Sequence, residues 1–96
     1  VALDLIGAAH VSCRSVPPGQ GTVKCEHGVM PVPAPATALL LRGAPLASSP
    51  VKAELTTPTG AAILAATVQE WTDSPAMTLQ RVGIGAGMKD FLEQPN

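Results

Sequence analysis

Thr22-Val23-Lys24-Cys25-Glu26-His27-Gly28-Val29-Met30-Pro31-Val32-Pro33-Ala34-Pro35 is the most informative segment of the sequence, because it joins a β-branched run to an arm with proline at every second residue. Each proline fixes its own φ angle and keeps the residue before it out of the helical region, so the arm is expected to be extended and stiff. The thiol of Cys25 and the imidazole of His27 are good ligands for a borderline or soft metal ion. The stretch therefore predicts a metal-binding pair on a rigid arm.

Cys25 and His27 also have a simpler interpretation, a half-buried strand cysteine followed by an exposed histidine without any metal. Adding His10 and Cys13 gives a third interpretation, a four-ligand set with the order His-x-x-Cys and Cys-x-His. That set resembles a structural zinc site, although Cys-x-His is a tight spacing for two ligands of one tetrahedral ion. These alternatives stay open on the sequence alone.

Two strand-like runs, residues 10–16 and 22–25, flank a strong turn signal at Pro17-Pro18-Gly19-Gln20-Gly21. Antiparallel pairing across this turn would place Cys13 nearly opposite Cys25. Their Cα atoms would then lie within about 7 Å, as a disulfide requires. In a reducing compartment both residues are expected to be free thiols.

Two helices are expected after the proline arm. Residues 36–42 are helical in composition, with Pro35 suited to the first turn and Gly43 to the position after the end. The stronger helix starts at Thr57, a good N-cap, with Pro58 at its first position. Its apolar stripe has the spacing i, i+3, i+4 and i+7, continued by a tryptophan: Ala61, Leu64, Ala65, Val68 and Trp71. Of these residues, Leu64, Val68 and Trp71 are expected to be buried against the strands.

The runs 51–55 and 77–82 alternate in the manner of strands, and the first residues, 1–7, resemble the end of an apolar helix. Together these patterns predict an α+β fold, with a small, mostly antiparallel sheet of about four short strands and two or three helices. Residues 1–96 are expected to form a single domain. Both ends resemble cut points, so a fragment is expected whose apolar surface faces the remaining parts of the parent chain.

The start of the stronger helix is a candidate phosphate site. Free backbone N–H groups and the positive end of the helix dipole favour an anion at Thr57, Thr59 and Gly60, and threonine hydroxyls add donors. No lysine follows Gly60, so this is not a P-loop. An ordinary capped helix is the alternative.

Composition excludes several classes of function. The net charge is −1, the six Lys and Arg residues are scattered, and only 2% of residues are aromatic, so nucleic acid is not an expected partner. No apolar run approaches the roughly 20 residues that cross a bilayer. The N-terminal run also lacks the basic flank of a signal peptide, so a cytoplasmic protein without membrane contact is expected. One Trp, one Phe and no Tyr predict a thin core.

Three blocks in this order resemble one known family: residues 21–28 with 31–37, residues 54–64, and residues 83–91 with Pro95-Asn96. Together they are similar to the LarC family, the nickel-insertion proteins that mature the nickel-pincer nucleotide cofactor of lactate racemase. The resemblance spans essentially all 96 residues. Departures from it are modest: Glu93-Gln94, ahead of Pro95, stands where glycine or arginine is expected.

The resemblance implies a cyclometallase, a nickel chelatase of the lyase class. Such a protein inserts nickel into pyridinium bisthiocarboxylic acid mononucleotide in a CTP-dependent reaction assisted by a divalent ion such as manganese. This chain resembles the back part of the family's N-terminal region, without the CTP-associated C-terminal domain, so alone it is expected to be inactive.

Within that picture, Cys25 and His27 would hold nickel, and the helix start at Thr57, Thr59 and Gly60 suits the phosphates of the substrate or of CTP. The alternative is a scaffold or dimerisation domain with no metal binding of its own. The expected partners are the rest of the parent chain and the nucleotide substrate, with a homo-oligomer left open.

Overall fold

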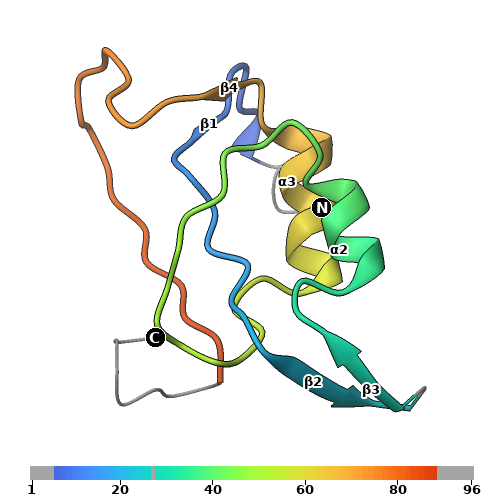
Figure 1. The fold of residues 1–96 in the computed structure, drawn as a ribbon. Coiled ribbons are helices and arrows are strands. Elements are labelled where there is room, and N and C mark those ends of the chain that lie inside the picture. Colours follow the sequence, from blue (N-terminus) through green and yellow to red (C-terminus); the bar gives the residue numbers. More distant parts are fainter. Residues whose placement is uncertain (1–5, 27, 89–96) are drawn as a thin grey trace.

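A computed structural model describes residues 6–26 and 28–88. Its elements are β1 (Ser12–Cys13), β2 (Thr22–Cys25), β3 (Gly28–Pro31), α2 (Pro35–Leu40), α3 (Pro58–Thr67) and β4 (Glu70–Trp71). Figure 1 shows α2 and α3 side by side, with β1 and β4 near one end of the helices and the β2–β3 hairpin projecting from the other. The α+β class predicted from the sequence agrees with this arrangement. The expected helix over residues 1–7 and the end of the third motif, residues 89–96, lie largely or wholly outside the described residues.

The described strands form two separate pairs rather than one mostly antiparallel sheet of four. β1 pairs with β4 in parallel, and β2 pairs with β3 in antiparallel register from Thr22 opposite Pro31 to Cys25 opposite Gly28. Gly28 has a φ of +104°, which favours glycine at the sharp reversal between β2 and β3. The hairpin therefore forms on the C-terminal side of β2.

The predicted hairpin between residues 10–16 and 22–25 is wrong. Cys13 lies opposite Trp71 and Cys25 lies opposite Gly28, on different sheets, and both are free thiols. Residues 17–21, which were expected to form a turn, do not reverse the strand and instead form hydrogen bonds to residues 55–56. The carbonyl of Pro18 accepts from the backbone N–H of Leu55 at 3.1 Å, and the Pro17 carbonyl accepts from the Thr56 hydroxyl at 2.8 Å.

The strands predicted at residues 51–55 and 77–82 are not present in the described structure. In the first run, Glu54 makes only an isolated bridge to Gly19. Alternation of apolar residues indicates that a strand would be half-buried, but a strand also requires a neighbour for its backbone groups. Figure 1 shows the chain after β4 running down the side of the molecule opposite the helices.

Both helices begin as predicted. Pro35 occupies the first turn of α2. The helix ends at Leu40 rather than at Arg42, so Gly43, with a φ of +84°, lies two residues beyond the C-cap Leu41. Thr57 caps α3, because its hydroxyl oxygen accepts from the backbone N–H of Gly60 at 3.1 Å. The helix ends one residue before Val68, which shortens the predicted stripe.

The core is thin, as the scarcity of large side chains predicted. Val16, Leu41 and Ala61 form its buried cluster, and Leu64 and Trp71 pack against it while remaining partly exposed. The burial predicted for Leu64, Val68 and Trp71 is therefore partial. Many large apolar side chains remain exposed, among them Leu39, Ile63, Met77, Leu79, Val82, Ile84 and Met88. Within the described residues, no helix is long and apolar enough to cross a membrane.

Candidate functional site

Cys25 ends β2 at the tip of the β2–β3 hairpin, where its side chain is exposed. Its Sγ donates to the backbone carbonyl of Gly28 at 3.3 Å, across the two strands. A thiol in this position is accessible to a metal ion or a small molecule. His27 lies outside the described residues, so the expected convergence of Cys25 and His27 on one groove stays a prediction.

The β2–β3 hairpin is stabilised by a hydrogen bond at its base as well as by the pairing along its strands. The backbone N–H of Val32 donates to the Gly21 carbonyl at 2.9 Å, one step beyond the Thr22–Pro31 pair. The extended backbone then bends before Pro35 starts α2. The proline arm is therefore stiff and extended only as far as Pro31, and its remainder turns the chain into a helix.

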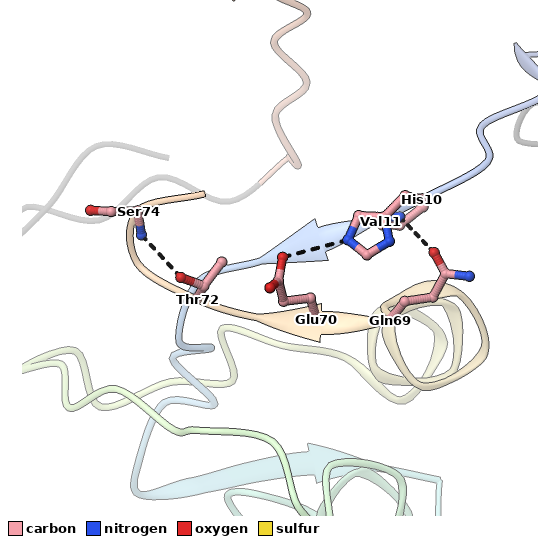
Figure 2. Close-up of polar contacts among 6 residues, drawn as sticks. All are labelled: His10, Val11, Gln69, Glu70, Thr72 and Ser74. Carbon is pink, nitrogen blue, oxygen red and sulfur yellow. Dashed lines mark hydrogen bonds and ion pairs between the residues drawn. The ribbon is translucent and has the colours of Figure 1, made fainter. Parts of the chain in front are cut away.

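The four-ligand set with His10 and Cys13 is wrong. His10 lies beside β1, where its Nε2 is 3.5 Å from Oε1 of Glu70, and Figure 2 shows the two side chains pointing toward each other. Cys13 faces Trp71 across the β1–β4 pair, on a different sheet from Cys25. Residues 6–26 and 28–88 contain no cluster of three or more His, Cys, Asp or Glu side chains arranged to hold a metal ion.

The helix start at residues 56–60 uses most of its polar groups internally. The Thr57 oxygens accept from Gly60 and Ala61, Pro58 has no N–H, and the Thr56 hydroxyl donates to Pro17. The Thr59 backbone N–H and hydroxyl are the groups that these bonds leave for a ligand. This geometry is that of a capped helix, and phosphate binding by Thr57, Thr59 and Gly60 stays a prediction.

A small pocket, which the sequence did not predict, lies beside the β1–β4 pair. Its volume is about 180 Å³, and it is lined by Ser15, Pro45, Trp71, Thr72 and Asp73. These residues come from three separate segments of the chain, so no local motif could have revealed the pocket. The only usable signal in the sequence was the lone tryptophan just beyond a helical stripe.

Hydrogen bonds fix the strand that carries Trp71. The backbone N–H of Thr72 donates to the Cys13 carbonyl at 2.9 Å. Figure 2 shows the Gln69 side chain accepting from the Val11 N–H at 3.0 Å, and the Thr72 hydroxyl accepting from the Ser74 N–H at 3.3 Å. The backbone on both sides of Trp71 is therefore anchored.

Comparison with known proteins identifies close sequence relatives. A family model described as nickel insertion protein matches residues 1–96. A putative nickel insertion protein of Syntrophotalea carbinolica is 49% identical over 96 residues, which is 100% of this chain and 24% of that protein. The pyridinium-3,5-bisthiocarboxylic acid mononucleotide nickel insertion protein of Staphylococcus epidermidis is 45% identical over 91 residues, covering 95% of this chain and 23% of that protein.

The relative of that same name in Geobacillus kaustophilus is 42% identical over 96 residues, covering 100% of this chain and 23% of that protein. This chain thus spans about a quarter of the length of the curated relatives that it matches. No solved structure matches it significantly.

Proposed function

The chain belongs to the family of nickel insertion proteins, and on that premise we propose that it forms part of a cytoplasmic protein that inserts nickel into pyridinium-3,5-bisthiocarboxylic acid mononucleotide. The observation that carries the proposal is the exposed Cys25 thiol at the tip of a well-anchored hairpin, within the residues that the family model matches. Nickel is the cargo of this reaction, so its site must both bind the ion and release it.

Cys25 and His27 are the proposed nickel ligands. A thiolate and a neutral imidazole select a borderline ion such as nickel over hard cations. Two protein ligands also leave coordination positions open, so that the sulfur atoms of the thiocarboxylic acid groups can enter before the protein ligands depart. Exposure of Cys25 supports this exchange, because nickel can then reach and leave its sulfur atom without a conformational change of the hairpin.

The CTP dependence and the assisting divalent ion implied by the resemblance to LarC belong to the same proposal. The helix start at Thr57, Thr59 and Gly60 is the proposed contact for a phosphate of the substrate or of CTP. Its support is the Thr59 backbone N–H and hydroxyl that remain after capping, together with the positive end of the α3 dipole.

A scaffold or dimerisation role is the second candidate, and one observation favours it. Large apolar side chains are exposed along residues 77–88, where Ile84 is 93% exposed and Met88 is 99% exposed. Such surface is typical of a region that another chain or domain covers.

Nickel titration of the chain separates the two candidates. The metal-handling role predicts micromolar nickel binding by calorimetry, lost in Cys25→Ser and retained in Cys13→Ser, whose thiol lies on the other sheet. Absence of nickel binding to the folded wild-type chain would favour the scaffold role. Circular dichroism of each variant provides the folding control.

A further inference from the structure

Trp71 lies between the core and an open pocket. It packs against the buried cluster of Val16, Leu41 and Ala61, and it also lines the pocket beside β1 and β4. Because the pairing of β1 with β4 fixes its backbone, the indole is held in place before any ligand arrives. A preorganised aromatic side chain of this kind loses little conformational entropy on binding.

The pocket offers a specific combination of chemical groups. Trp71 contributes an aromatic ring of the kind that attracts a flat cation, Asp73 adds a negative charge, and the hydroxyls of Ser15 and Thr72 are hydrogen-bonding groups. Its volume of about 180 Å³ is below the roughly 300 Å³ at which pockets for whole small molecules begin. The pocket therefore suits one ring of a ligand rather than a complete nucleotide.

We propose that this pocket receives the pyridinium ring of the mononucleotide substrate, stacked on Trp71, with the ribose and phosphate outside. The assignment rests on the proposed function, which supplies a substrate with a flat, positively charged ring. The ring nitrogen's charge faces the Trp71 π system and the Asp73 carboxylate, the two groups that favour a cation over a neutral ring.

The acid substituents of the ring require a positive partner at the rim. Arg14 supplies it, since its Nε lies 3.8 Å from Oδ1 of Asp73, which lines the pocket. Both side chains are more than three-quarters exposed, so this ion pair is weak and exchanges readily with a ligand. Arg14 can turn toward a thiocarboxylate while Asp73 stays near the ring.

Cys25 does not face this pocket within one chain. Figure 1 shows β4 and the β2–β3 hairpin at opposite ends of the two helices. Ring binding at Trp71 and nickel binding at Cys25 are therefore separate events that a second copy or the rest of the parent protein brings together. This separation makes ring binding measurable on its own.

The test is calorimetry of the substrate mononucleotide with the complete protein, in the absence of nickel. Trp71→Leu keeps apolar bulk against the core but removes the aromatic face, so we expect affinity to fall about tenfold. Trp71→Phe should recover most of that loss. Ribose 5-phosphate, which lacks the pyridinium ring, should bind equally to wild type and Trp71→Leu. Thermal melting of each variant controls for folding.

Unchanged substrate affinity in folded Trp71→Leu would overturn the pocket assignment. If affinity is unchanged in Trp71→Leu and the wild type inserts nickel, the proposed function is retained and only the assignment of the ring to this pocket is wrong. Failure of the wild-type protein both to bind the mononucleotide and to insert nickel would overturn the two together.

Discussion

Cys13 lies directly opposite Trp71 in the parallel β1–β4 pair, and both side chains pack against the buried cluster of Val16, Leu41 and Ala61. This contact joins parts of the chain on either side of both helices. It shields one thiol with the core, whereas the other thiol, at Cys25, is exposed at the hairpin tip. The two cysteines therefore differ in environment and in expected chemistry.

Thiol labelling should report this difference. Reactivity follows access to the sulfur atom, so Cys25 should react with Ellman's reagent several-fold faster than Cys13. The time course should show two phases, with the fast phase lost in Cys25→Ser and the slow phase lost in Cys13→Ser. Equal rates, or a faster Cys13, would show that the shielding by the core is wrong.

Ala61 is the buried residue of α3 in the core cluster, with an exposed fraction of 0%. Ala61→Leu adds volume that this site cannot hold, so it should lower the free energy of unfolding by about 1–3 kcal/mol. The matched control is Ala62→Leu, at an exposed position on the same helix, which should change stability little. Urea denaturation of the two variants measures the difference, and equal stability would contradict the packing.

Gly19 combines a φ of +93° with a crowded surrounding, because a Cβ there would collide with the Ala53 carbonyl and lie 2.9 Å from the Leu55 nitrogen. Gly43 also has a positive φ, but a Cβ would meet nothing within 4 Å. Gly43→Ala should cost about 1 kcal/mol of backbone strain, and Gly19→Ala clearly more. Thermal unfolding of both variants provides the test. A Gly19→Ala protein as stable as Gly43→Ala would refute the contact between residues 17–19 and 53–55.

Thr57 should contribute as an N-cap. Thr57→Ala removes the acceptor for the Gly60 N–H and should lower stability by about 1 kcal/mol. Thr59→Ala, inside the same first turn, should be neutral or slightly stabilising because alanine favours a helix. Chemical denaturation compares the two. If Thr59→Ala proves to be the more destabilising change, the cap assignment fails.

Local features were predictable from the sequence, and long-range partners were not. Thr57, Pro58 and Pro35 act through residues within one turn, so the starts of both helices follow from their positions. The ends do not, since α2 ends at Leu40 and α3 at Thr67. The pairing of Ser12-Cys13 with Glu70-Trp71 spans nearly 60 positions, and nothing in either run specifies the other. The turn signal at residues 17–21 was misassigned for the same reason, since its partner lies at residues 54–56.

The candidate site likewise has one part that the sequence predicts and one part that only the fold reveals. Cys25 was identifiable because its chemistry and its motif are contiguous in sequence, and its exposure at a hairpin tip agrees with a role in handling a ligand. The Trp71 pocket depends on segments that meet only in the fold, which is why no motif predicted it. His10 lies beside Glu70 of the β1–β4 pair, on a different sheet from Cys25, which the sequence also did not show.

The central claim concerns Cys25, and nickel incorporation into the mononucleotide by the complete protein tests it most directly. The exposed thiol contributes little packing, so Cys25→Ser should leave the melting temperature nearly unchanged while abolishing nickel insertion, and Cys13→Ser should retain insertion. Mass spectrometry of the nucleotide product measures the incorporated metal. Full nickel insertion by a folded Cys25→Ser protein would contradict the account.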